Sequence, residues 1–85
     1  MDSGVKEMEY DVLRRVIARY LLVDPNEITP ETTFLSDLGA DSLDLYQIIN
    51  GVEEELGITA PLDDIVKITN VQEALDLILE AEQAK

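Results

Sequence analysis

The sequence contains no cysteine and no histidine among its 85 residues. Without cysteine, the side chains can form neither a disulfide framework nor a thiolate metal site, and they supply no thiol. Without histidine, the chain lacks the commonest general base and the commonest ligand of transition metals. We therefore predict that the protein is not an enzyme, with no catalytic residue and no metal ligand.

Basic residues are scarce as well. Six lysines and arginines stand against 19 aspartates and glutamates, which gives a formal net charge of −13 at pH 7. No basic residue lies between Arg19 and Lys67, and most of the acidic residues fall in that stretch. Such a charge repels nucleic acid and anionic membrane surfaces. The sequence therefore predicts no nucleic-acid partner, and it favours protein partners with basic docking patches.

The chain also lacks a long apolar run. No run approaches the roughly 20 residues that span a bilayer, and Met1–Gly4 lacks the basic region followed by an apolar one that begins a secretory signal. We therefore predict no membrane insertion and a cytoplasmic location. The length fits one small domain, which we predict over residues 1–85 as a monomer, with a core from about residue 8 to residue 80.

What the sequence does contain is helical periodicity. Apolar residues recur at three- and four-residue spacing in three segments, the pattern of amphipathic helices. We predict an all-α fold, a small antiparallel four-helix bundle with three main helices and a short third helix. The predicted core-facing residues are Met8, Val12, Leu13, Val16, Ile17, Tyr20 and Leu21 in the first helix, Leu45, Ile48, Ile49, Val52 and Leu56 in the second, Val71, Ala74, Leu75, Ile78 and Leu79 in the last, and Phe34 and Leu35 in the intervening loop.

Local signals mark where these helices begin and end. Asp41 is a good N-cap for the second helix, and Gly57 is a good stop because glycine accepts the left-handed conformation that often follows a helix. A short helical turn is predicted over residues 62–66. Asn70, with Glu73 three residues later, has the spacing of a capping box and predicts the start of the last helix.

The segment Asp37-Leu38-Gly39-Ala40-Asp41-Ser42-Leu43-Asp44 places one serine at the start of the second helix, between two aspartates. Because no histidine can act as its base, Ser42 is not expected to be a nucleophile. The free N–H groups and dipole of a helix N-terminus favour a phosphate. The pattern therefore indicates a serine that is modified, with a phosphodiester held at the helix start.

The same segment resembles the phosphopantetheine attachment motif of acyl carrier proteins. The resemblance runs from about Met8 to Glu80, because further segments resemble the family in order: Asp24-Pro25 with Ile28–Thr32, Glu53-Glu54-Glu55-Leu56, and Lys67–Val71. It implies a carrier whose Ser42 receives 4′-phosphopantetheine from coenzyme A through a phosphopantetheinyl transferase. The thiol of the arm would carry acyl groups as thioesters between acyltransferases, ketosynthases or acyl ligases of fatty-acid, polyketide or related acyl-lipid synthesis.

The resemblance also implies two sets of site residues. The residues expected to face partner enzymes are Asp41, Leu43, Asp44, Gln47, Asn50, Glu53 and Glu54. Those expected to line an acyl cavity are Ile48, Ile49, Val52, Ile65, Leu75 and Ile78.

Four positions depart from the fatty-acid type of the family. Glu, Met and Ala are common where this chain has Gln47, Asn50 and Gly51, and a small aliphatic residue is common at Tyr46. Glycine inside a helix costs about 0.5–1 kcal/mol relative to alanine, and it allows a close backbone approach. Together the changes suggest partners that differ from the general fatty-acid synthase set.

Other functions compete with the carrier. An aminoacyl or peptidyl carrier would differ only in cargo, although Ala40-Asp41 before the serine resembles freestanding acyl carriers more. A non-carrier acidic adaptor would retain its function in a Ser42→Ala variant. A serine hydrolase is not expected without histidine, and the spacing of Asp37, Asp41 and Asp44 does not fit a calcium-binding hand.

Overall fold

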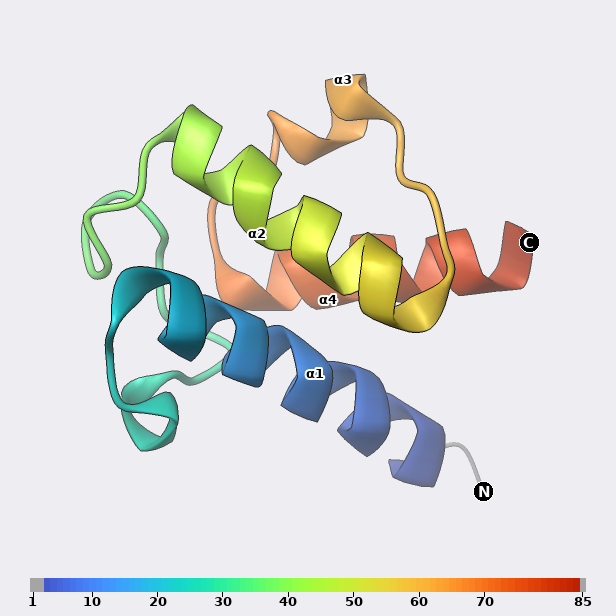
Figure 1. Ribbon diagram of the computed structural model, residues 1–85, viewed down its shortest axis with the longest axis horizontal. Coiled ribbons are helices and arrows are strands. Elements are labelled where there is room, and N and C mark those ends of the chain that lie inside the picture. The colour runs from blue at the N-terminus through green and yellow to red at the C-terminus, as the bar shows by residue number, and fades with distance from the viewer. Residues whose placement is uncertain (1–2, 85) are drawn as a thin grey trace.

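In a computed structural model, the described chain consists of four α-helices and one turn of 3-10 helix (Figure 1). The structure describes residues 3–84, with side chains from residue 7. The elements are α1 (Ser3–Leu21), η1 (Pro25–Glu27), α2 (Ser42–Leu56), α3 (Leu62–Ile65) and α4 (Val71–Ala84). The predicted domain limits, residues 1 and 85, lie outside the described residues. Met1 and Asp2, which belong to the segment expected to contain no secretory signal, lie outside them as well.

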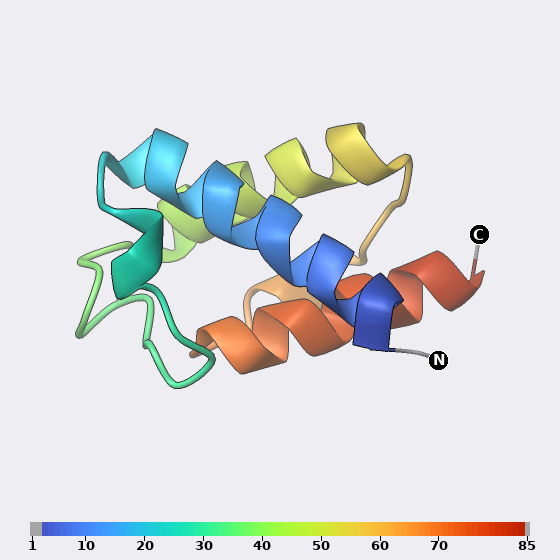
Figure 2. The same cartoon turned by 90° about the horizontal axis from the view of Figure 1, so that it is seen from below.

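The three long helices pack against one another as a bundle. α1 and α2 run in opposite directions, α1 also packs against α4, and α3 contacts both α2 and α4 (Figures 1 and 2). The predicted all-α bundle with a short third helix is confirmed. Within residues 3–84, no helix is both long enough and apolar enough to cross a bilayer.

α2 begins and ends where the sequence predicted. The backbone N–H of Asp44 donates to Asp41 Oδ1 at 3.0 Å, and the N–H of Asp41 donates to Asp44 Oδ2 at 3.3 Å, which completes a capping box. Gly57 ends the helix in the left-handed conformation, with φ of 67°. Both ends are therefore fixed by local chemistry.

Of the two hydrogen bonds of the capping box predicted for α4, one is confirmed and the other is shifted by one residue. Asn70 Oδ1 accepts the N–H of Glu73 at 2.8 Å, as expected. The carboxylate of Glu73 reaches one residue further back, to the N–H of Thr69 at 2.7 Å and its hydroxyl at 2.9 Å. Glu73 therefore holds the connection that leads into α4.

The predicted core is largely confirmed. Leu21, Leu56 and Leu79 are half-buried against it. Leu77, Ala81, Ile28 and Ile58 are buried although they were not predicted to be. The confirmed buried residues are Val12, Leu13, Val16 and Ile17 of α1, Leu45, Ile48, Ile49 and Val52 of α2, Val71, Ala74, Leu75 and Ile78 of α4, and Phe34.

Two core predictions in α1 were wrong. Met8 is exposed, because the buried face is centred on Leu13 and Ile17 and so includes Glu9 instead. The Glu9 side chain is 1% exposed, and its Oε1 has no hydrogen-bond partner within the described residues. Tyr20 is also exposed, because it lies in the last turn of α1, one residue before the helix ends.

The prediction for Leu35 was wrong as well. Thr33 and Asn70 form an isolated antiparallel bridge, and the N–H of Phe34 donates to the carbonyl of Thr69 at 3.0 Å. Residues 34–38 form a turn directly after this bridge. Phe34 packs into the core and is 2% exposed, whereas Leu35, the next residue of the turn, is 70% exposed.

Candidate functional site

The loop that leads to Ser42 is fastened to the last helix by backbone hydrogen bonds. Besides the bond from Phe34, the N–H of Val71 donates to the carbonyl of Thr32, and the N–H of Gln72 donates to the carbonyl of Pro30, both at 2.9 Å. The buried side chain of Phe34 adds an apolar anchor. The loop therefore has a defined shape although it contains no helix or strand.

Asp37 closes the turn that follows this bridge. Its Oδ2 accepts the N–H of Thr33 at 2.8 Å, and its own N–H donates to the Thr33 hydroxyl at 3.1 Å. The backbone hydrogen bond from Thr33, followed by the one from its side chain, lowers the pKa of Asp37 below its ordinary value. This carboxylate, the first residue of the motif, is thus a structural part of the loop.

The chain then turns sharply into α2. Gly39 has φ of 66°, a left-handed conformation that glycine adopts without strain. The N–H of Ala40 donates to the carbonyl of Phe34 at 2.8 Å, and the Ala40 side chain is buried. Asp41 is left as the N-cap, and Ser42 becomes the first residue of the helix.

Ser42 is exposed at this helix start. The backbone N–H groups of Ser42 and Leu43 have no hydrogen-bond partner within residues 3–84, because the capping box uses only those of Asp41 and Asp44. Two free donors and the positive end of the α2 dipole favour an anion at the serine hydroxyl. The site thus fits a phosphate ester on Ser42.

A groove of about 520 Å³ opens beside Ser42. One wall comes from the loop before α2, and the other from the connection between α3 and α4. Two apolar side chains stand on these walls, Leu35 and Val66, which are 70% and 55% exposed. Its lining residues are Thr33, Phe34, Leu35, Ser36, Ala40, Asp41, Ser42, Leu45, Val66, Ile68 and Thr69.

The second wall is held by Glu73. Its hydrogen bonds to the backbone and hydroxyl of Thr69 lower the pKa of Glu73, the backbone bond contributing most. Each wall of the groove is therefore held by one exposed carboxylate, Asp37 on the loop side and Glu73 on the α3–α4 side.

None of the six residues predicted to line an acyl cavity borders this groove. The structure places them in the core between the helices, where all six are buried: Ile48, Ile49, Val52, Ile65, Leu75 and Ile78. Sequence reasoning missed the groove because its walls come from segments more than 20 residues apart that only the fold brings together. The sole sequence signal was the pair of segments, residues 37–44 and 67–71, that each resemble the family.

The seven predicted partner-facing residues lie on or before α2, and their surroundings differ. Asp41, Leu43, Gln47 and Glu54 are exposed, whereas Asp44, Asn50 and Glu53 are half-buried. The Glu53 Oε2 atom accepts the N–H of Ala60 at 2.6 Å, so this carboxylate holds the loop between α2 and α3. The exposed large apolar side chains on α2 are Leu43 and Tyr46.

Gly51 marks a close approach between α1 and α2. A Cβ atom built at Gly51 would lie 3.1 Å from Cγ1 of Val16, which is shorter than an ordinary carbon–carbon contact of about 3.5–4.0 Å. This supports the interpretation that Gly51 allows two backbones to approach.

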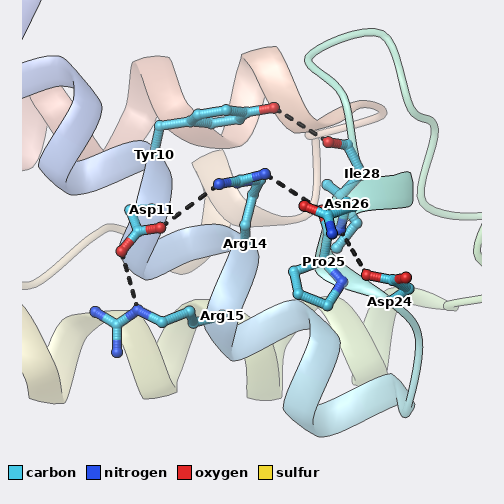
Figure 3. A network of polar contacts seen from close by, with 8 residues as sticks. All are labelled: Tyr10, Asp11, Arg14, Arg15, Asp24, Pro25, Asn26 and Ile28. Carbon is cyan, nitrogen blue, oxygen red and sulfur yellow. Dashed lines mark hydrogen bonds and ion pairs between the residues drawn. The ribbon is translucent and has the colours of Figure 1, made fainter.

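The first loop is anchored to α1 by a polar network (Figure 3). The Tyr10 hydroxyl donates to the carbonyl of Ile28 at 3.3 Å, and Arg14 donates to the carbonyl of Pro25 at 3.4 Å. The Arg14 guanidinium also lies 5.1 Å from the centre of the Tyr10 ring and pairs with Asp11. These contacts explain why residues 24–28, one of the segments with family resemblance, follow α1 in a fixed position.

Comparison with known proteins agrees with this site. The family model described as "Phosphopantetheine attachment site" matches residues 11–78. The acyl carrier protein of Rubrobacter xylanophilus is 43% identical over 72 residues, which cover 85% of this chain and 89% of that relative. Members of this family are carriers rather than enzymes, and they bear covalently attached 4′-phosphopantetheine. The chain therefore belongs to the acyl carrier protein family.

Proposed function

We propose that Ser42 is the residue that bears the 4′-phosphopantetheine arm. The observation that carries this proposal is the exposed Ser42 at the start of α2, beside two free backbone N–H groups and inside the matched span of residues 11–78. Those N–H groups, of Ser42 and Leu43, would hold the phosphate. The arm supplies the thiol that this chain, without cysteine, cannot supply itself.

We propose that the groove beside Ser42 receives the arm. Its lining combines apolar side chains with hydroxyl groups, and this combination suits a chain that has both amide and aliphatic parts. Leu35 and Val66 would cover the arm from the two walls. The six buried residues predicted for an acyl cavity remain predictions, for the part of the cargo that passes beyond the groove.

The face around Ser42 supports docking to enzymes with basic patches. Leu43 is an exposed apolar side chain that stands between Asp41 and Asp44 in the sequence, the arrangement of an anchor with a charged rim. The family implies a phosphopantetheinyl transferase and acyl-handling enzymes as partners. Acyltransferases, ketosynthases or acyl ligases are our proposal for the latter, as are fatty-acid, polyketide or related acyl-lipid synthesis for the pathway. The cytoplasmic location remains a prediction from the sequence.

Intact-protein mass spectrometry tests the attachment site. The protein is incubated with coenzyme A, magnesium and a broad-specificity phosphopantetheinyl transferase. The parent should gain one phosphopantetheine, and Ser42→Ala should gain none. Ser36→Ala is the matched control, because Ser36 is an exposed serine that lines the same groove, and this variant should be modified like the parent. Modification of Ser42→Ala would refute the assignment, and a parent that stays unmodified with the host's own transferase would favour the adaptor.

Cargo analysis separates the carrier classes. The protein is recovered with its arm from the organism that encodes it, and the thioester is released and identified by mass. An acyl chain supports the acyl carrier, whereas an amino acid or peptide would favour the aminoacyl or peptidyl carrier.

A further inference from the structure

Leu22, directly after α1, combines two features that do not help the isolated fold. It has φ of 60° and is the only non-glycine residue with a positive φ within the described chain. A residue with a Cβ atom is strained in this conformation, which glycine or asparagine usually occupies. Leu22 is also 89% exposed, more than any other large apolar residue described. Its side chain thus stands in solvent on a strained backbone.

Basic residues are concentrated on the last two turns of α1, before this leucine, in a chain that is otherwise acidic. Three of the six basic residues are arginines within residues 14–19. Arg15 and Arg19 are four residues apart on α1, which places them on one side of the helix end, and Leu22 follows directly after the helix. Arg15 is exposed and pairs with Asp11 at 3.2 Å. The exposed guanidinium of Arg19 makes no hydrogen bond or ion pair with any residue of the described part.

We propose that this end of α1, formed by Arg15, Arg19, Tyr20 and Leu22, is a docking surface for a protein that presents an apolar recess bordered by acidic residues. Charge complementarity determines the partner's chemistry: the unpaired guanidinium of Arg19 matches a carboxylate, and Leu22 matches a recess. The surface carries arginines and an exposed leucine, unlike the acidic face around Ser42, which suits basic partners. The two surfaces therefore select different partner surfaces.

An anionic membrane, a nucleic-acid duplex and a second copy of this chain fit this surface less well. At physiological salt, charges interact over only about 8 Å, so a contact limited to the end of α1 depends on the charges there, chiefly the unpaired guanidinium of Arg19 and the exposed carboxylate of Asp24. A membrane or a duplex is a more extended anionic surface, and it would also meet the acidic residues nearby. A duplex, in addition, offers Leu22 no apolar recess. A second copy would bring together two chains of net charge −13.

Figures 1 and 2 both place the C-terminal end of α1 and the N-terminal end of α2 at the same end of the bundle. A protein bound at the end of α1 would therefore lie on the side of the molecule that presents Ser42. An assembly could engage both surfaces at once.

Site-directed photo-crosslinking tests the proposal in the organism that encodes the protein. p-Benzoylphenylalanine replaces Tyr20, which is 45% exposed, or in the control Tyr46, which is 41% exposed on α2. Position 20 should give an adduct that position 46 does not give. The adduct should fall about tenfold in Leu22→Gly and in Arg19→Glu backgrounds, as for loss of an interface anchor.

Three controls separate docking from folding, net charge and carrier function. Lys67→Glu makes the same charge change as Arg19→Glu on an exposed residue elsewhere and should leave the adduct unchanged. Leu22→Gly should unfold at the same or a higher temperature than the parent, because glycine relieves the backbone strain. A Ser42→Ala background should retain the adduct, so the outcome does not depend on the proposed attachment site.

The captured protein is then expressed and purified, and its dissociation constant for the parent is measured by calorimetry. That constant should increase about tenfold with Leu22→Gly and with Arg19→Glu. The proposal is overturned if position 20 gives no adduct, if both positions give the same adducts, if the adduct persists in both variants, or if the adduct is a second copy of this chain.

Discussion

Gly51→Ala is the change whose effect the structure constrains best, because two terms of opposite sign meet there. Alanine inside a helix is favoured over glycine by about 0.8–1 kcal/mol. The new Cβ atom, however, would lie 3.1 Å from Cγ1 of Val16, short of an ordinary contact by about 0.4–0.9 Å. Val16 is buried, and a valine in a helix has one strongly preferred rotamer, so it cannot easily turn away.

Overpacking of this kind typically costs about 1–3 kcal/mol. The expected net effect of Gly51→Ala is therefore a loss of about 1 kcal/mol in the free energy of unfolding. Val16→Ala removes the atom that causes the clash. In that background, Gly51→Ala should instead stabilise the protein by about 0.8–1 kcal/mol, so the coupling between the two positions should be about 2 kcal/mol.

Urea unfolding followed by far-UV circular dichroism measures all four members of this cycle. The Val16→Ala single variant is the reference for the double variant. If Gly51→Ala stabilises the parent and the Val16→Ala protein equally, then α1 and α2 do not approach closely at Gly51, and the packing argument is wrong.

Three further predictions concern the held loops and the strained residue. Glu53→Ala should cost about 1–2 kcal/mol in urea unfolding, because it leaves the N–H of Ala60 without its acceptor; an unchanged unfolding midpoint would show that water replaces the carboxylate at no cost. In the folded state, the pKa values of Asp37 and Glu73 are lowered from 3.8 and 4.5. At a pH between the folded and unfolded pKa values, the unfolded state therefore binds more protons than the folded state. The contribution of these two carboxylates to stability should be complete above about pH 5 and lost as the pH falls below 4. The double variant Asp37→Asn with Glu73→Gln should flatten this part of the pH profile of stability. If the double variant loses stability in acid just as the parent does, the two carboxylates do not have this role. Leu22→Gly should raise stability by about 0.5–1 kcal/mol through relief of the left-handed strain, whereas a clear loss would mean that Leu22 packs in the folded state.

Helix boundaries were predictable because their causes are local. Asp41, Gly57 and Asn70 each act within four residues, through a side-chain cap or a left-handed backbone, so their identity and spacing were sufficient. The core faces of α2 and α4 followed from periodicity for the same reason. Ser42 was predicted as the attachment site from one short segment, and the structure places it exposed after the glycine turn.

The errors arose where the fold selects between local choices. Periodicity allowed either Met8 or Glu9 on the inner face of α1, and only the position of the neighbouring helices selects Glu9. Leu35 has the apolar side chain of a core residue, but it lies in the turn that follows the bridge between Thr33 and Asn70, and it is exposed there. The groove was beyond sequence reasoning because it exists only once residues 33–42 and 66–69 lie side by side.

The backbone bonds from residues 30–34 to residues 69–72 also bear on when the carrier can be loaded. They close a long stretch of chain, and contacts between such distant segments form late, after the loop-closure entropy has been overcome. During synthesis, the loop before Ser42 therefore lacks its fastening until α4 has left the ribosome and docked. A transferase that recognises the folded loop would then act on chains that have already folded and pass over nascent ones.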